Sequence, residues 1–556
     1  RGGRRFGGVP STGEETTLRS LGFTVRKQPS AWDCMAAQGK AFDMSVSRMA
    51  LELMDLINDD PETPKDGDKP KDEDDKKPKD DEKKSDKKGD KKKDDKKEDK
   101  PDLLDGIPDW FIGQALADLT AHEVGHTLGL RHNFKASAAY TRTQVNSLEF
   151  KGKKAFSTSV MDYNPVNVNM DKSLIQGDYN QLTIGPYDMW AIEYGYTNGD
   201  PVKVAQRAAE PELQFGSDED AGGIDASIRR YDLFADPLEY AQQRYELAKY
   251  SRARIIEKFV KDGQSWAKAR RGYTLSLNMQ ADAMSIMSNW VGSAYVRRDR
   301  KGDPNGRPPL EVVPAKQQRA ALNFVLETAF KDDAYGLTPD LLKYLTIDRF
   351  QDPGAGRGSP DWAINDQIGG VQASVLSQLI NPVRLSRIYD NEARVPQGDD
   401  ALTLPEMLDT VSDSVFSELK DLSGGTPRKP SISSLRRNLQ REFVDRLITI
   451  AVEANIPGQA GKAITTLAAA KLKDLRSKMD PYVKNGGNLD AYTRAHIADA
   501  AKRIDKALDA QYTFNGGGGG GGGFPFFLFM KDGQLQAMPP SNVPSSRPAG
   551  DSVESK

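Results

Sequence analysis

The segment from Asp59 to Lys100 most constrains how this chain can fold, because it contains no aliphatic or aromatic side chain. It consists of Lys, Asp and Glu with scattered Pro, Gly, Ser and Thr. Such a segment buries no apolar surface that would offset the entropy lost on ordering. We therefore expect residues 59–101 to form a disordered Lys/Asp-rich insertion. Because its lysines alternate with aspartates that nearly neutralise them, a solvated spacer is favoured over a nucleic-acid-binding segment.

A second change in composition lies near the C-terminal end, where eight consecutive glycines follow Asn515. We expect residues 513–556 to form a Gly-rich disordered tail. The longest strongly apolar run, residues 524–530, is far shorter than the roughly 20 residues of a membrane-spanning helix, so no membrane span is expected. The formal net charge of −3 gives the chain no overall attraction to nucleic acid.

Residues 201–512 have the pattern of an α-helical accessory domain. Apolar residues recur there at spacings of three and four, which is typical of helices that pack on one face. His496, far in sequence from the other histidines, is expected to have a surface or core role. No fixed-period repeat is present, so the function of this region stays open. The expected helices are 237–263, 315–330, 433–454, 458–479 and 489–512.

Three of the four histidines lie within residues 121–132, AHEVGHTLGLRH. One long helix is predicted from Pro108 to at least Gly125, because proline suits a helix start and no breaker follows it. Val124 and Leu128 point away from the histidine face of this helix. We expect them to anchor the helix in a core.

The histidine spacing predicts a metal site. His122 and His126 are one helical turn apart and can direct ring nitrogens at a single cation, for which Zn²⁺ is the usual occupant. Gly129 has no Cβ, so it can adopt a left-handed conformation and turn the chain sharply. His132 then returns to the same ion as a third ligand.

Glu123 distinguishes a catalytic site from a storage site. It follows the first ligand and can reach the fourth coordination position, which three protein ligands leave to a water. Glu123 could take the proton of that water and pass it to the leaving nitrogen of an amide. The predicted reaction is peptide-bond hydrolysis without a covalent intermediate.

The sequence resembles the metzincin clan of zinc metalloproteases, whose signature is HExxHxxGxxH followed by a methionine-containing turn. The segment STSVMDYNP, residues 157–165, is similar to that turn. The resemblance implies that Met161 forms an apolar base below the metal and that Tyr163 is an extra zinc ligand or a hydrogen-bond donor to the oxyanion. A turn tyrosine packed on the surface is the alternative for Tyr163. Residues 187–196, YDMWAIEYGY, resemble the closing helix of the clan.

These motifs together resemble a family of large multidomain bacterial zinc-dependent metalloproteases, most strongly over residues 103–200. The resemblance implies an α+β, mostly helical fold with a metzincin-like catalytic subdomain at 102–200. It also implies a polypeptide substrate and a periplasmic or extracellular location.

The N-terminal part departs from the metzincin pattern, because the clan has a sheet-containing upper subdomain of ordinary domain size before the active-site helix. Only residues 1–58 precede the charged insertion, and we expect them to be a partial N-terminal part of the catalytic domain. The sequence begins at Arg1 without an initiator methionine or an apolar signal core, which favours a fragment. The upper part of the cleft is then expected upstream.

The sequence therefore predicts a zinc-dependent endopeptidase. A zinc-binding scaffold with little turnover and a hydrolase of non-peptide amides stay open as alternatives. A structural zinc site is a further alternative, although such sites are usually closed by a fourth protein ligand. Cys34, the only cysteine, excludes an intrachain disulfide and a site built from several thiolates.

Overall fold

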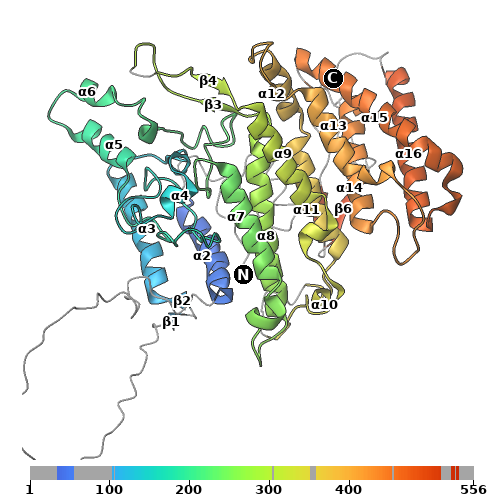
Figure 1. The fold of residues 1–556 in the computed structure, drawn as a ribbon, viewed down its shortest axis with the longest axis horizontal. Coiled ribbons are helices and arrows are strands. Elements are labelled where there is room, and N and C mark those ends of the chain that lie inside the picture. Colours follow the sequence, from blue (N-terminus) through green and yellow to red (C-terminus); the bar gives the residue numbers. More distant parts are fainter. Residues whose placement is uncertain are drawn as a thin grey trace, which may run out of the picture.

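The computed structural model describes residues 34–54, 107–303, 306–350, 358–453, 456 and 458–514, with strand segments at 103–104, 528–531 and 534–537. This part of the chain is mostly helical, as expected (Figure 1). The longer helices are α2 (Ala36–Leu53), α3 (Asp109–Thr127), α5 (Pro186–Tyr196), α7 (Pro237–Arg252), α8 (Ala267–Trp290), α9 (Ala315–Ala329), α11 (Ile364–Leu379), α12 (Pro382–Glu392), α13 (Leu404–Val415), α14 (Ser434–Ile448), α15 (Gln459–Asn485) and α16 (Ala491–Phe514).

Strands form only two-stranded antiparallel pairs in the described ranges. The last pair lies where we expected a disordered tail. Residues 513 and 514 of that tail end α16, and its remaining residues and the charged insertion lie outside the described residues. The strands are β1 (Leu103–Leu104) with β2 (Ile107–Pro108), β3 (Ala294–Val296) with β4 (Leu310–Val312), and β5 (Leu528–Lys531) with β6 (Gln534–Ala537). Short helices are α4 (Arg142–Val145), α6 (Pro201–Ala205) and α10 (Pro339–Leu342).

The predicted helix over 237–263 is wrong in its second half. Helix α7 ends at Arg252, and a π-helical turn, η3 (Ile255–Phe259), follows it. This wider turn brings Phe259 against α8 at Gly272, where an added Cβ would lie 2.8 Å from the phenylalanine ring. A second π turn, η7 (Thr449–Glu453), follows α14 inside the predicted helix 433–454. Both π turns pack against neighbouring helices, η3 against α8 and η7 against α15, and simple periodicity does not predict either of them.

Helix α3 confirms the predicted helix but corrects the face that packs. Val124 and Leu128 are 47% and 44% exposed, so neither anchors the helix in a core. The buried side chains of α3 lie instead on the same face as His122, because Phe111, Ala115 and Asp118 precede it at helical spacing. The face of this helix that carries His122 is therefore also the face that packs against the rest of the protein.

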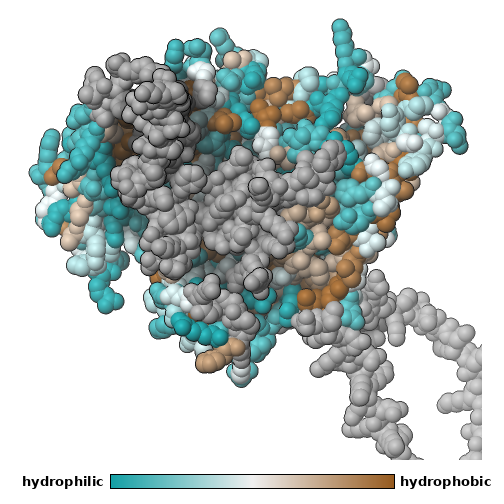
Figure 2. Space-filling view, turned by 180° about the vertical axis from the view of Figure 1, so that it is seen from behind, coloured by the Kyte–Doolittle hydropathy of each residue, from teal (hydrophilic) through white to brown (hydrophobic). Residues whose placement is uncertain are grey.

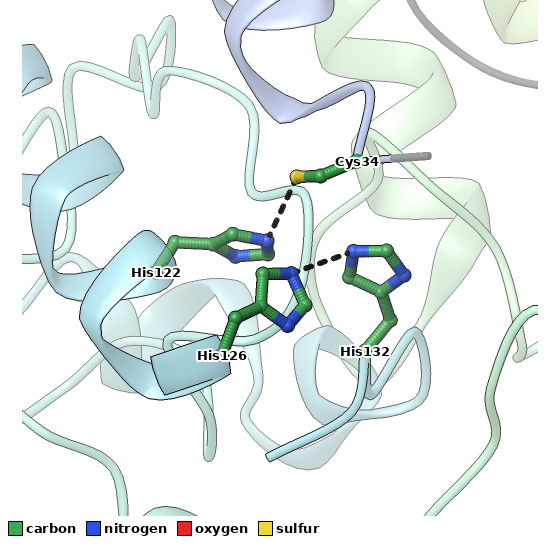
Figure 3. Close-up of side chains that lie close together, drawn as sticks. All are labelled: Cys34, His122, His126 and His132. Atoms are coloured by element: carbon green, nitrogen blue, oxygen red, sulfur yellow. Dashed lines mark hydrogen bonds between the residues drawn. The ribbon is translucent and has the colours of Figure 1, made fainter. Parts of the chain in front are cut away.

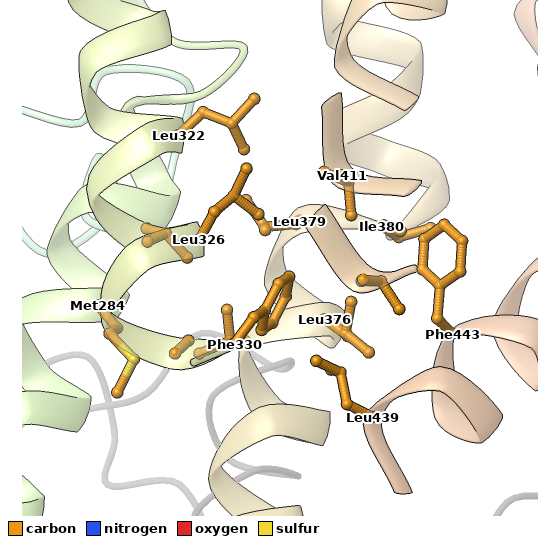
Figure 4. Packing of buried hydrophobic residues seen from close by; sticks show 14 of the residues in the cluster. Met284, Leu322, Leu326, Phe330, Leu376, Leu379, Ile380, Val411, Leu439 and Phe443 are labelled. Atoms are coloured by element: carbon orange, nitrogen blue, oxygen red, sulfur yellow. The ribbon is translucent and has the colours of Figure 1, made fainter. Parts of the chain in front are cut away.

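The helices from α7 to α16 stand side by side and share a hydrophobic core (Figure 1). Phe330 at the end of α9 packs among side chains of neighbouring helices, including Met284 of α8 and Leu376 of α11 (Figure 4). The same core includes Val145 and Phe156 from the histidine-containing part of the chain. One hydrophobic core therefore includes side chains from both sides of residue 200, the boundary expected between the catalytic subdomain and the accessory helices.

Helix α2 lies between α3 and the accessory helices (Figure 1). Its Val46 and Met49 share a second core cluster with Leu247 of α7 and Met279 of α8. This packing holds the N-terminal end of α2 over the histidines. Seen from behind, the coloured part of the surface carries hydrophilic side chains with hydrophobic patches among them (Figure 2). Within the described ranges, every helix is too short or too polar to cross a bilayer.

Candidate metal centre

The three clustered histidines converge in space. His122 and His126 project from the last two turns of α3, and Gly129 then turns the chain with φ of 86°, which confirms the predicted left-handed residue. His132 returns so that its Nε2 lies 3.2 Å from Nε2 of His126 (Figure 3). Together with Cys34 Sγ, the ligand atoms of these residues all lie within 4.8 Å of one another.

The second nitrogen of each ring determines which nitrogen is available to a metal. In all three rings Nδ1 faces an oxygen acceptor, so Nδ1 carries the proton and Nε2 presents a lone pair to the centre. The pairs are His122 with Val160 O at 2.8 Å, His126 with Leu130 O at 3.0 Å, and His132 with Asp218 Oδ2 at 2.7 Å.

This arrangement fits Zn²⁺. Two lone pairs that face each other at 3.2 Å repel unless a cation lies between them. Nitrogens bound to one tetrahedral zinc at 2.0–2.1 Å would be about 3.3 Å apart, close to the observed separation. Burial lowers the pKa of His122 to about 3, so that ring stays neutral and able to ligate.

Asp218 orients His132 and was missed by the sequence analysis. It lies beyond residue 200, in the region assigned to the accessory domain. Its second oxygen accepts a hydrogen bond from Arg230 at 2.8 Å. Burial opposes ionisation of Asp218, but the hydrogen bonds from His132 and Arg230 outweigh it and lower its pKa. The ring of His132 therefore faces a charged carboxylate.

Met161 lies directly beneath the histidine helix. It is fully buried, and its Sδ would be only 2.3 Å from a Cβ added at Gly125. Glycine between the two helical histidines therefore allows the thioether to approach the backbone of α3.

Asp188, near the start of α5, holds the turn that contains Met161. Its carboxylate accepts hydrogen bonds from Ser159 Oγ at 2.5 Å and from the backbone N–H of Val160 at 2.8 Å. Since Val160 O accepts the proton of His122 Nδ1, Asp188 supports a ligand candidate through the backbone. Sequence reasoning did not assign a role to Asp188. The signal that could have found it is the carboxylate near the start of the motif YDMWAIEYGY, which resembles the closing helix of the clan.

Tyr163 is 3% exposed, so the alternative of a surface turn tyrosine is wrong. Its Oη lies 3.1 Å from His132 Nε2 and accepts a hydrogen bond from the backbone N–H of Met35 at 2.8 Å. Burial raises the pKa of Tyr163, so the phenol keeps its proton as a hydrogen-bond donor.

Glu123 is exposed to solvent and faces the centre. Its Oε1 lies 3.4 Å from Cys34 Sγ. The same sulfur lies 3.5 Å from His122 Nε2 (Figure 3). The carboxylate therefore contacts the sulfur that lies among the ring nitrogens. Cys34 is the second group at this centre that sequence reasoning did not assign.

Comparison with known proteins decides the family. A family model described as Met-zincin matches residues 105–422, more than half of the chain. The chain belongs to the Met-zincin family. This supports a zinc metalloprotease of the metzincin clan, and the match extends over Asp188, Asp218 and most of the accessory helices. No curated protein and no solved structure matches this Met-zincin significantly.

Proposed function

We propose that this Met-zincin is a zinc-dependent endopeptidase in which His122, His126 and His132 hold the metal. The observation that carries the proposal is the shared orientation of the three rings. Each Nδ1 is bound to an oxygen, so three Nε2 lone pairs point to one centre. Such nitrogen donors suit Zn²⁺, which when bound polarises a carbonyl and lowers the pKa of water.

Glu123 is the proposed general base. Its Oε1 lies 3.4 Å from the Cys34 sulfur at the centre, and the residue is exposed to solvent, so the carboxylate can take a proton from the attacking water and deliver it to the leaving nitrogen. Tyr163 is the proposed donor to the oxyanion. Its protonated Oη lies 3.1 Å from His132 Nε2 and could donate a hydrogen bond to a substrate oxyanion that forms next to the histidines.

The residues below the rings have supporting roles in this proposal. Met161 fills the space under α3 without offering a charged ligand, and Asp188 fixes the turn that carries it. A polypeptide is the proposed substrate and export to the periplasm or exterior the proposed location, both on the basis of the family.

The test is the variant Glu123→Gln, which keeps the shape of the side chain and removes the base. We expect kcat/KM on unfolded casein to fall about 10²–10⁴-fold, the usual contribution of general acid–base catalysis. Zinc content, measured by elemental analysis, should stay at one ion per chain. Glu149→Gln, a solvent-exposed carboxylate paired with Lys154, is the matched control and should leave both quantities unchanged.

Full activity of Glu123→Gln would contradict the proposed role of Glu123. Loss of zinc from a His122→Ala variant is required as well, because retention would exclude the histidine site. A parallel assay on acylated amino sugars separates peptide hydrolysis from hydrolysis of other amides. Cleavage of the sugars alone would replace the endopeptidase with the non-peptide amidase.

A closed zinc site without turnover is the second candidate. The observation that favours it is Cys34, since a sulfur lies among the three rings as a fourth protein donor. Structural zinc sites are usually closed in this way. The carboxylate of Glu123 next to that sulfur favours the protease.

A further inference from the structure

Cys34 occupies the place that an attacking water would need. Its Sγ lies 3.5 Å from His122 Nε2, 3.4 Å from Glu123 Oε1 and 3.6 Å from Tyr163 Oη. These are a ligand candidate, the proposed base and the proposed oxyanion donor. Figure 3 shows the sulfur beside the ring of His122. The sulfur and a catalytic water would therefore compete for one position.

The distances also suit a sulfur ligand. Zinc binds thiolate at about 2.3 Å and imidazole at 2.0–2.1 Å, which places sulfur and nitrogen about 3.5–3.6 Å apart in a tetrahedron. The separation of Cys34 Sγ from His122 Nε2, 3.5 Å, matches this value. The Nε2 separation of 3.2 Å between His126 and His132 matches its nitrogen counterpart.

The segment that carries Cys34 is held against the site by its own contacts. The N–H of Met35 donates to Tyr163 Oη at 2.8 Å, and Tyr231 Oη donates to the carbonyl of Met35 at 3.4 Å. One turn later, the buried ammonium of Lys40 pairs with the buried carboxylate of Asp118 on α3. The start of α2 is therefore docked on the histidine helix with the sulfur facing the rings.

We propose that the Cys34 thiolate is the fourth ligand of the metal and keeps the site closed until it withdraws. The inference rests on the proposed function, which supplies the metal. Closing would form one sulfur–metal bond, release the water from the fourth position and transfer the thiol proton to Glu123 Oε1 or to solvent. Opening would break that bond, admit a water to the fourth position and return a proton to the sulfur, and neither step changes an oxidation state. Cys34 is only half-buried, so solvent can reach the sulfur and replace it.

The first test uses Co²⁺ in place of Zn²⁺, because a thiolate bound to Co²⁺ gives an intense near-ultraviolet charge-transfer band. The chain has a single cysteine, so such a band can come only from Cys34. We expect the band in the wild type and in Ser45→Ala, a half-buried control position on α2 whose hydroxyl bonds only to the Ala41 carbonyl of the same helix. The Cys34→Ala variant should bind one Co²⁺ per chain and lack the band.

The second test measures whether the fourth position is free, using acetohydroxamate as a small metal-binding probe. If the site is closed at least nine-tenths of the time, the wild type binds the probe about tenfold or more weakly than Cys34→Ala. The visible spectrum of the Co²⁺ forms reports this binding without any substrate. The Ser45→Ala control should bind the probe as weakly as the wild type.

The outcomes separate this inference from the proposed function. One metal ion per wild-type chain without a charge-transfer band overturns Cys34 as a ligand and leaves the protease standing. Equal probe affinity in wild type and Cys34→Ala overturns the closed site, even if the band is present. Failure of both proteins to bind any metal overturns the histidine site itself, and with it both proposals.

Discussion

His132 differs from the other two histidines at the centre in the charge of the group that accepts its Nδ1 proton. Its Nδ1 donates to the carboxylate of Asp218, whereas His122 and His126 donate to neutral backbone carbonyls. A carboxylate acceptor raises the basicity of the ligating nitrogen and fixes the ring orientation. Asp218 is therefore a positioning residue that acts through His132.

The variant Asp218→Asn tests this role at the scale of one residue. We expect zinc affinity to fall about 10–100-fold, the usual effect of losing such a partner, as measured by competition with a chelator. The neighbouring Glu219 pairs with Arg131 at the surface, so Glu219→Gln is the matched control. Equal affinities of the two variants would show that Asp218 does not support the metal.

The packing of helix α2 depends on one close contact, between Gly39 and Tyr231. Gly39 lies so near Tyr231 that an added Cβ would be 1.6 Å from the phenol oxygen. Tyr231 also has φ of 62°, an uncommon conformation for a residue with a side chain. The backbone of Tyr231 therefore fixes the position of its ring. Position 39 of α2 has room only for a residue without a Cβ.

Gly39→Ala is expected to destabilise the fold by about 1–3 kcal/mol, because the new methyl group overpacks the contact with Tyr231. Gly113→Ala on α3 is the matched control, since nothing lies within 4 Å of a Cβ at that position. There, alanine should stabilise the helix by up to about 1 kcal/mol. Denaturant unfolding measures both, and a stabilising effect of Gly39→Ala would contradict the close approach.

At the scale of the whole molecule, His496 links stability to pH. It lies on α16, is 4% exposed, and its Nε2 donates to Gln440 of α14 at 2.8 Å. Burial, assisted by the nearby Arg441 and Arg437, lowers its pKa from 6.5 to about 4. The core role of this histidine is thereby confirmed over the surface one.

The unfolded chain therefore binds a proton on His496 near pH 6.5, whereas the folded chain binds it only near pH 4. Above pH 6.5 His496 is neutral in both states and does not lower the free energy of unfolding. As the pH falls toward 4, the free energy of unfolding decreases by up to about 3 kcal/mol, because the unfolded chain binds the proton first. His496→Gln should lose less stability over this interval than the wild type. Parallel pH curves of unfolding for the two proteins would contradict the prediction.

Local sequence was sufficient for the features that depend on neighbouring residues. The one-turn spacing of His122 and His126 follows from helix geometry, and the turn that returns His132 follows from the freedom of Gly129 at positive φ. The start of α3 directly after Pro108, and its extent, follow from the same local rules. These features required no knowledge of the rest of the chain.

Tertiary structure alone decided which groups surround the rings. Cys34 reaches His122 across 88 residues of sequence, and Asp218 reaches His132 across 86. It also decided that α3 buries its histidine face and exposes Val124, the reverse of the expected packing. A spacing rule describes one element at a time, whereas these contacts exist only because α2, α3 and the loop at Asp218 pack against one another.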